Sequence, residues 1–260
     1  MTRCSILLPI QRRQVLQNYL ALHGGGSIKV LSDQFGVSEM TIRRDLELLE
    51  HQGHVARSHG GAIYVDKLLG EPALPDKQAR NPDLKEKLAS YAAERFVSDG
   101  DVLIVEGGTT VLRMAAYLKQ SQLTLMTNGL DALQQLRVAA ERHTVLCCGG
   151  VLRVPSSTFV GPVAESFFTQ YHANTAFLSA LCFTVEAGFT DPNLMDTQVK
   201  KAMIRSAART VMLLDSSKIG NRSFATVAQL NEVSVLVTDS GIPETIRQAC
   251  DEAGVELHIV

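Results

Sequence analysis

The sequence predicts two domains of different class: a small N-terminal domain of helices and a β-hairpin, then a larger α/β domain with a mostly parallel sheet. Three observations support this. The chain has 260 residues, which is long for a single domain. Amphipathic helical segments, each followed by glycine, fill the first 65 residues. From residue 84 onward, apolar strands alternate with helices, as in a parallel sheet covered on both faces.

The composition is that of an ordinary globular protein, with 45% apolar and 20% charged residues. No apolar run reaches the roughly 18 residues of a membrane span, and the first apolar stretch is too short for a signal peptide. Cysteines occur without CxxC spacing, which favours reduced thiols and a cytoplasmic location. His143, His172 and the Cys147-Cys148 pair share no ligand spacing, so neither a metal site nor a cofactor is expected.

The net charge of −2 favours no nucleic-acid partner for the chain as a whole. The charge is distributed unevenly, however. Residues 1–65 hold seven Lys or Arg against five Asp or Glu, whereas the remainder holds 18 against 22. This mild asymmetry slightly favours a DNA-binding role for the first domain.

The N-terminal domain is expected to contain three helices and a hairpin. The predicted ranges are helices over 11–22, 30–35 and 39–52, the last preceded by Ser38, and a hairpin over 55–65. Glycines follow each helix, at 24–26, 36 and 53, and the Gly60-Gly61 pair lies between two β-prone runs. Three consecutive glycines are more than the first turn needs.

The third helix has the pattern of a helix that reads DNA. Ile42, Leu46 and Leu49 lie on one face, and Met40 and Arg44 point the other way. Arginine donates two hydrogen bonds to guanine, threonine reaches a phosphate or a thymine methyl, and a serine cap leaves the helix start attractive to phosphate. The hairpin adds basic residues for the DNA backbone. The candidate DNA-binding residues are Ser38, Met40, Thr41, Arg43, Arg44, Arg57 and His59.

Residues 66–83 are predicted to be a linker between domains over 1–65 and 84–260, because this stretch holds Pro72, Pro75 and Pro82. The alternative is an ordered connector that packs on one domain. Three leucines in the stretch are available for such packing.

The second domain is expected to alternate strands and helices. Strands are predicted over 101–106, 124–128, 144–150, 175–181, 210–215, 233–239 and 255–260, and helices over 84–96, 111–119, 130–141, 194–208 and 243–253.

Polar and glycine-rich segments follow several of these strands, at the edge where open α/β sheets bind ligands. Glycines allow the backbone to approach a phosphate closely, and lysines add positive charge. Each segment alone also fits ordinary turn chemistry, and Lys200-Lys201 also fits a solvated helix face. The candidate effector-binding residues are Glu106, Gly108, Thr109, Thr110, Thr127, Asn128, Gly149, Gly150, Lys200, Asp215 and Lys218.

Two stretches, Val37–Leu46 and Arg57–Ala62, resemble the winged helix-turn-helix of DeoR-family bacterial regulators. The second domain also resembles that family, at Lys87, the Gly-Thr-Thr loop, Thr127-Asn128, Gly149-Gly150, Gly161, 176–178, Gly188, Lys200 with 202–204, Asp215 with Lys218, and Thr238-Asp239. The resemblance implies a sensing domain similar to ribose-5-phosphate isomerase and glucosamine-6-phosphate deaminase. It also implies a phosphorylated sugar or related metabolite as effector.

Three positions depart from the family pattern: Glu106 replaces an aspartate, Asn174 an acidic residue and Ser179 a glycine. We expect these changes to alter the contacts to the sugar more than the contacts to its phosphate. A common hexose phosphate is therefore not assumed as the effector.

The sequence predicts a repressor of carbohydrate-metabolism genes, with double-stranded operator DNA and a small phosphorylated sugar or sugar acid as partners. A homo-oligomer, dimer or tetramer, is expected because one short helix makes few base contacts. Two alternatives remain: a sugar-phosphate isomerase or deaminase with a DNA-binding appendage, and an activator or dual regulator. The enzyme alternative needs a general base, for which Glu106 and Asp215 are the candidates.

Overall fold

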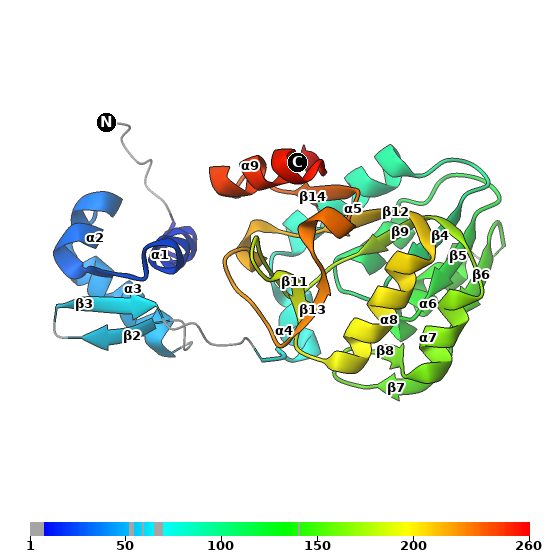
Figure 1. Ribbon diagram of the computed structural model, residues 1–260, viewed down its shortest axis with the longest axis horizontal. Coiled ribbons are helices and arrows are strands. Elements are labelled where there is room, and N and C mark those ends of the chain that lie inside the picture. Colours follow the sequence, from blue (N-terminus) through cyan, green and yellow to red (C-terminus); the bar gives the residue numbers. More distant parts are fainter. Residues whose placement is uncertain (1–7, 52–54, 59, 65–69, 140) are drawn as a thin grey trace. The chain divides into compact units, whose positions relative to one another are not determined.

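The computed structural model describes residues 8–51, 55–58, 60–64, 70–139 and 141–260 (Figure 1). The chain divides between Leu68 and Leu69 into two compact units. None of the helices in the described ranges combines the length and the apolar character that a membrane span needs.

The first unit contains three helices and a small antiparallel sheet, in the arrangement of a winged helix-turn-helix. Its helices are α1 (Pro9–His23), α2 (Ile28–Phe35) and α3 (Glu39–His51), and its strands are β1 (Gly25–Ser27), β2 (Val55–Ser58) and β3 (Gly61–Tyr64). The sheet order is β1-β3-β2. Leu16, Leu20 and Leu31 meet Ile42 and Leu46 in a shared core, so each helix buries one apolar face. The three helices and the hairpin predicted from the sequence are confirmed.

Strand β1 was not predicted, and it explains Gly25, whereas Gly24 ends α1 in the left-handed conformation. Gly25 pairs with Ile63 and Ser27 pairs with Gly61. A Cβ atom on Gly61 would lie 2.3 Å from the carbonyl oxygen of Gly26, and one on Gly25 would lie 2.8 Å from that of Ala62. The two backbones therefore approach more closely than side chains permit.

Gly61→Ala is expected to destabilise the first unit by about 1–3 kcal/mol, because the added methyl group forces β1 and β3 apart. Urea unfolding followed by circular dichroism measures the loss. Gly60→Ala is the matched control, since a Cβ there meets no atom within 4 Å. Equal destabilisation by both variants would contradict this explanation.

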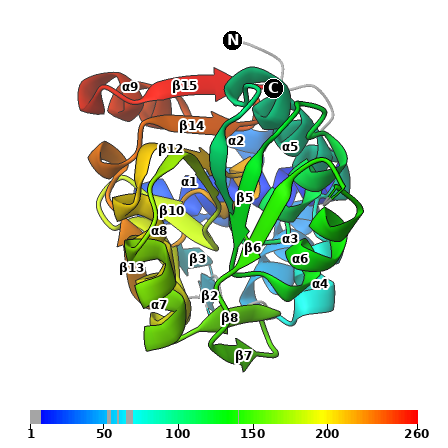
Figure 2. The ribbon, with the colours of Figure 1, turned by 90° about the vertical axis from the view of Figure 1, so that its right-hand side faces the viewer.

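The second unit is built on a seven-stranded sheet in the order β15-β14-β12-β9-β4-β5-β6 (Figure 2). Every neighbouring pair is parallel. The strands are β4 (Val102–Val105), β5 (Thr124–Thr127), β6 (Thr144–Cys147), β9 (Ala173–Leu178), β12 (Ala207–Leu213), β14 (Val235–Thr238) and β15 (Glu256–Ile259). These are the seven strands that the sequence predicts, since continuous apolar runs are typical of strands covered on both faces.

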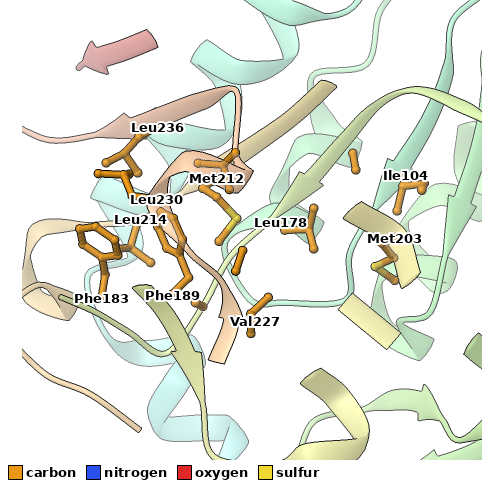
Figure 3. Close-up of a cluster of buried hydrophobic side chains, with 14 of the residues drawn as sticks. Ile104, Leu178, Phe183, Phe189, Met203, Met212, Leu214, Val227, Leu230 and Leu236 are labelled. Atoms are coloured by element: carbon orange, nitrogen blue, oxygen red, sulfur yellow. The ribbon is translucent and has the colours of Figure 1, made fainter. Parts of the chain in front are cut away.

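Helices cover both faces of this sheet. Leu103 and Val105 of β4 face a core shared with α5 (Pro82–Phe96) and the 3₁₀ turn η1 (Val111–Ala116). Ile104 faces the opposite core, which includes side chains of α7 (Pro162–Thr169), α8 (Leu194–Arg205) and α9 (Glu244–Ala253). Ile104, Leu178, Met203 and Met212 belong to this second core in Figure 3. The alternation along β4 therefore places one hydrophobic core on each face.

Several helical predictions need correction. The helix expected over 111–119 is the 3₁₀ turn η1, and the helix expected over 130–141 ends earlier, as α6 (Leu130–Leu136) followed by the 3₁₀ turn η2 (Arg137–Ala139). Short elements were missed because three to eight residues carry too little periodicity. They are β7 (Val151–Arg153), β8 (Thr158–Val160), α7, β10 (Cys182–Thr184), β11 (Gly188–Asp191), β13 (Ala225–Ala228) and the 3₁₀ turns η3 (Ser216–Lys218) and η4 (Leu230–Glu232).

The described part of the segment 66–83 packs on the second unit. It contains α4 (Leu74–Ala79) and the start of α5. Glu71 forms an ion pair with Arg153, which belongs to β7. Residues 70–83 therefore behave as the ordered connector considered above, while the boundaries 1–65 and 84–260 stay a prediction.

Candidate functional site

The third helix of the first unit presents a polar, exposed surface opposite its buried face. Met40 is 62% exposed, whereas Ile42 and Leu46 are buried. Ser38 caps the helix, because its Oγ accepts a hydrogen bond from the Thr41 backbone N–H at 3.2 Å. The Thr41 hydroxyl lies 2.9 Å from the same oxygen. The helix start is therefore ordered by Ser38 and Thr41, as the sequence suggests.

The basic residues of this surface differ in how their charges are satisfied. Arg43 lies 3.7 Å from Glu39, and Arg57 lies 3.8 Å from both Glu47 and Glu50. No carboxylate among the described residues pairs with exposed Arg44. Arg44 is thus the cation of α3 that is available to a DNA base without breaking an existing pair. His59, predicted to contact DNA, lies outside the described residues.

A buried ion pair between α1 and α3 was not foreseen. Asp45 is 2% exposed and accepts from the Arg12 Nε at 2.6 Å, with Arg13 at 3.6 Å. The two arginines therefore orient α3 on α1 instead of contacting DNA from the surface. A charged residue within the apolar face of a predicted helix is the sequence signal for such a pair.

The second unit holds a cavity of about 160 Å³ at the carboxyl edge of the parallel sheet. This is well below the roughly 300–1,000 Å³ of drug-sized pockets, so it suits a small metabolite. Strand β4 leads into it through Glu106 and the glycine loop, and strand β9 through Ser179. Five predicted effector-binding residues line it: Glu106, Gly108, Thr109, Lys200 and Lys218.

The other six predicted residues do not line the cavity, and several of them hold its walls instead. The Asn128 Oδ1 accepts from the Gly107 N–H at 3.0 Å, and the Thr127 Oγ1 accepts from the Gly129 N–H at 3.0 Å. These bonds fix the loop after β4 against the loop after β5. The residues outside the lining are Thr110, Thr127, Asn128, Gly149, Gly150 and Asp215.

Asp215 is fully buried and holds neighbouring residues through hydrogen bonds. Its Oδ1 accepts from the Asn81 Nδ2 at 2.9 Å and from the Ser217 N–H at 3.2 Å. Burial opposes its charge, but Lys218, Ser217 and Asn81 outweigh burial and lower the pKa of this carboxyl. Asp215 therefore stays charged and helps to hold Lys218 at the cavity.

One end of the cavity is rich in positive charge. Lys85, Lys218 and Arg80 all line it. The Lys218 Nζ donates to the Ser179 Oγ at 2.9 Å, and the Lys85 Nζ donates to the Thr109 Oγ1 at 3.2 Å. Burial, then the nearby charges of Lys218, Arg113 and Arg80, lower the pKa of Lys85 to about 8 despite the attraction of Asp215. Burial and the charge of Lys200 likewise lower the pKa of Lys218.

A group of carboxylates around Lys200 lies beside these cations, because the Lys200 Nζ donates at 2.7 Å to the carbonyl of Ser179, the residue whose hydroxyl accepts from Lys218. The Lys200 Nζ donates to the Asp191 Oδ2 at 2.6 Å and lies 3.4 Å from the Glu106 Oε1. Burial works against the charge of Lys200, but Asp191 and Glu106 outweigh it and raise the pKa of Lys200. Burial also raises the pKa of Glu106, whose Oε2 has no hydrogen-bond partner among the described residues. Lys200 is thus a paired, buried cation and not part of a solvated helix face.

The three departures from the family pattern fall in different places. Ser179 and Glu106 line the cavity. Asn174 does not, because it lies at the start of β9, where its Oδ1 accepts from the Val102 N–H at 2.8 Å. Asn174 is therefore too far away to contact a ligand bound in this cavity, because the amino ends of the strands lie at the opposite edge of the sheet.

Lys85 is the most informative residue that the sequence reasoning missed. It lies on the buried face of α5 together with Leu88 and Ala89 and is 2% exposed. Lys87, which fits the family pattern, is exposed instead. A lysine at an apolar helix position could have identified it. The other missed cavity residues include Glu71, Thr158, Asp191 and Asp196.

The described residues contain no group of three or more His, Cys, Asp or Glu placed to hold a metal ion. Four described cysteines are free thiols: Cys147, Cys148, Cys182 and Cys250.

Both units match known families. Residues 12–68 match the DeoR-like helix-turn-helix domain, and residues 80–240 match the DeoR C terminal sensor domain. The chain belongs to the DeoR family of transcriptional regulators. A DeoR-family protein binds DNA through its helix-turn-helix and a small-molecule effector through its sensor domain, so the predicted family, fold class and general function are confirmed.

Similar proteins extend over nearly the whole DeoR-family chain. An uncharacterized HTH-type transcriptional regulator of Bacillus subtilis, YulB, is 35% identical, and the match covers 98% of each chain. The HTH-type transcriptional regulator GlpR of Haloferax volcanii is 33% identical over 96% of this chain and 97% of its own. A putative aga operon transcriptional repressor of Escherichia coli O157:H7 is 32% identical over 96% and 93%. These relatives are named as regulators and not as enzymes.

Among solved structures, ribose-5-phosphate isomerase A of Methanocaldococcus jannaschii is a neighbour of this DeoR-family chain. It is 19% identical, with 54% of this chain and 55% of the isomerase covered and a TM-score of 0.40.

Proposed function

We propose that this protein is a repressor of carbohydrate-metabolism genes and that a phosphorylated sugar or sugar acid releases it from operator DNA. The observation that carries the effector class is the unequal pairing of charges within the cavity. Lys85, Lys218 and Arg80 form no ion pair with a carboxylate among the described residues, whereas Lys200 is paired with Asp191 and Glu106. A sugar phosphate offers an anion to the unpaired cations and hydroxyl donors to the carboxylates.

The net charge of the cavity by itself favours no ligand. Its lining holds five Lys or Arg side chains and five Asp or Glu side chains. The preference for an anion depends on which of these charges are paired with one another. Lys200 is neutralised by Asp191 and Glu106, and Lys77 by Glu71.

Lys85, Lys218 and Arg80 form no ion pair with a carboxylate among the described residues. We call the part of the cavity that these three cations line the anion end. Burial lowers the pKa values of both lysines, and like charges lower them further: Lys218 acts on Lys85, and Lys200 acts on Lys218. A bound anion would therefore relieve an unfavourable accumulation of positive charge. The Thr109 hydroxyl beside Lys85 adds a hydrogen-bond donor for a phosphate oxygen. We therefore place the phosphate or carboxylate of the effector here.

The carboxylate side of the cavity, around Lys200, is suited to hydroxyl groups. Carboxylate oxygens accept from sugar hydroxyls, and the free Oε2 of Glu106 is buried without a partner among the described residues. Asp196 accepts from the Thr158 hydroxyl at 2.6 Å and lies 3.2 Å from Arg153, so its orientation is set before a ligand arrives. We place the hydroxyls of the effector on this side.

We propose that the protein represses its target genes and does not activate them. The E. coli relative is named a transcriptional repressor. Activation or dual regulation stays the alternative, because the direction of control depends on where the operator lies relative to the promoter. We place this function in the cytoplasm, where a bacterial regulator meets its DNA.

A dimer or tetramer is part of the proposal. The exposed surface of α3 is short, and helix-turn-helix proteins gain affinity from two half-sites bound by a symmetric pair of recognition helices. Light scattering in the presence of DNA tests this, and a monomer on DNA would contradict it.

Fluorescence anisotropy tests the proposed function directly. DNA from upstream of the protein's own gene is labelled and titrated at stated salt, with and without a panel of sugar phosphates and sugar acids. We expect specific binding that one compound releases. Binding that no compound alters would overturn the proposed effector class, and binding no stronger than the salt-sensitive background would overturn the operator assignment.

The affinity for a phosphorylated ligand is expected to fall as the pH rises from 7 to 9. Lys85 is protonated below its pKa of about 8 and loses its charge above it, whereas a phosphate monoester keeps both charges above pH of about 6. Binding of the anion favours protonated Lys85, so binding takes up a proton above pH 8 and weakens by up to about tenfold per pH unit.

Isothermal titration calorimetry in buffers of different ionisation enthalpy measures this proton uptake. In Lys85→Met the affinity should be lower at pH 7 and its dependence on pH should be lost. Lys201→Ala, outside the cavity lining, should keep the wild-type dependence. The same slope in wild type and Lys85→Met would exclude Lys85 as the titrating group.

A further inference from the structure

The segment 70–81, which we call the strap, forms one wall of the cavity in the second unit. Its lining residues are Glu71, Pro72, Leu74, Asp76, Lys77 and Arg80. Residues 69–79 lie outside both family matches, which end at 68 and begin again at 80. In sequence the strap follows the wing strand β3 after residues 65–69. Among the described segments that line the cavity, the strap is therefore the nearest in sequence to the DNA-binding unit.

Polar contacts hold the strap in place at both ends. Glu71 accepts from the Arg153 Nη1 at 2.8 Å, and a second bond joins the same two groups. Asn81 donates to Asp215 at 2.9 Å. Between these ends, the Lys85 Nζ donates to the backbone carbonyl of Lys77. The anchors are thus side chains of the second unit that lie next to, or within, the proposed effector site.

Hydrophobic packing contributes little to this attachment. Helix α4, the centre of the strap, has no buried side chain among its six residues. Segments that bury few apolar side chains open at low free-energy cost compared with core elements such as the sheet of this unit. The strap can therefore be released or fixed without disturbing the hydrophobic cores.

Arg80 links the strap to the anion end of the cavity. It is exposed, and no carboxylate among the described residues forms an ion pair with it. Its charge is close enough to Lys85 and Cys182 to affect the pKa values of both side chains. Two of the three cations at this end, Lys85 and Lys218, belong to the body of the sensor unit, and the third belongs to the strap.

We propose that the strap is part of the effector site: the anionic group of the ligand binds Arg80 together with Lys85 and Lys218 and so fixes the strap against the sensor unit. This rests on the proposed function, because it assigns the third cation of the same anion site. A ligand that binds the fixed strap more tightly than the released strap shifts that equilibrium. The strap is joined in sequence to the DNA-binding unit through residues 65–69, so fixing the strap fixes the point of the sensor unit from which that connection starts.

Hydrogen exchange of the full-length protein, read at peptides covering 70–81, tests the proposal. The probes are ribose 5-phosphate, glucosamine 6-phosphate and inorganic phosphate, whose binding is measured independently by calorimetry. We expect the probe that binds to slow exchange in the strap about tenfold or more, while exchange in β12 and β14 stays unchanged. In Glu71→Gln, strap exchange should be faster without any probe, because the main anchor is weakened.

Arg80→Ala separates this inference from the proposed function. We expect it to weaken binding of the probe about tenfold or more and to abolish the slowing of strap exchange. Arg95→Ala, which removes an exposed arginine outside the cavity lining, is the matched control and should behave as wild type.

The outcomes that overturn each claim differ. A probe that binds wild type and Arg80→Ala equally, with strap exchange unchanged, would overturn the role of the strap and leave the proposed effector site standing. Failure of every phosphorylated probe to bind would overturn both. Strap exchange that Glu71→Gln leaves unchanged would show that the Glu71–Arg153 pair is not an anchor.

Discussion

Lys218→Ala is expected to produce a regulator that binds its operator but no longer responds to its effector. Lys218 provides a half-buried positive charge at the anion end of the cavity, and a hydrogen bond from such a charge to a phosphate contributes about 1.5–3 kcal/mol. Its loss should weaken effector binding by roughly 10- to 150-fold. Calorimetry with the effector found by the anisotropy panel measures this change, and anisotropy measures the DNA affinity.

The fold of this variant is expected to persist. Asp215 loses the opposite charge of Lys218 but keeps its hydrogen bonds from Asn81 and Ser217. Lys201→Ala is the matched control, because this neighbour of Lys200 does not line the cavity. A normal effector response in Lys218→Ala would remove Lys218 from the site, and with it the position that we assign to the phosphate.

Arg44→Ala is expected to abolish specific operator binding while the protein stays folded and keeps its affinity for the effector. Arg44 is the exposed cation of α3 without a carboxylate partner in the described part of the chain. A bidentate arginine–guanine contact contributes about 1–3 kcal/mol of discrimination. The loss is therefore roughly 5- to 150-fold for each half-site, and a dimer on two half-sites loses it twice.

Operator and scrambled DNA, compared at several salt concentrations, distinguish a base contact from a phosphate contact. A base contact lowers affinity for the operator alone, whereas a phosphate contact lowers both affinities and reduces the dependence on salt. Lys119→Ala removes one exposed positive charge from the sensor unit and serves as the control. Equal losses on the two DNAs would show that Arg44 holds the backbone and does not read sequence.

Arg57 is expected to matter less than Arg44, although the sequence places both at the DNA surface. Arg57 lies between Glu47 and Glu50, so it contacts DNA only at the expense of these interactions. The spacing of residues along the chain could not show this, because β2 and α3 meet only in the folded unit.

The sequence by itself determined the larger architecture. All seven strands of the parallel sheet were predicted, since most of them are apolar runs and the longer helices between them, α5, α8 and α9, are periodic. It also determined the reading face of α3, because Ile42, Leu46 and Leu49 recur at helical spacing and leave Met40 and Arg44 exposed. Local pattern was sufficient in both cases.

Only the tertiary structure decided which polar residues share the cavity. Lys85 enters from α5 and Lys218 from the turn after β12, residues far apart in the sequence. Asp215 and Asn128, which were predicted to bind the ligand, lie outside the cavity lining and hydrogen-bond to Asn81 and Gly107, while their part in ligand binding stays a prediction. The contacts of a side chain depend on which segments cross near it, and that proximity arises from packing and not from local sequence. The same reason explains Gly25 and Gly61: their need for glycine appears only when β1 lies against β3.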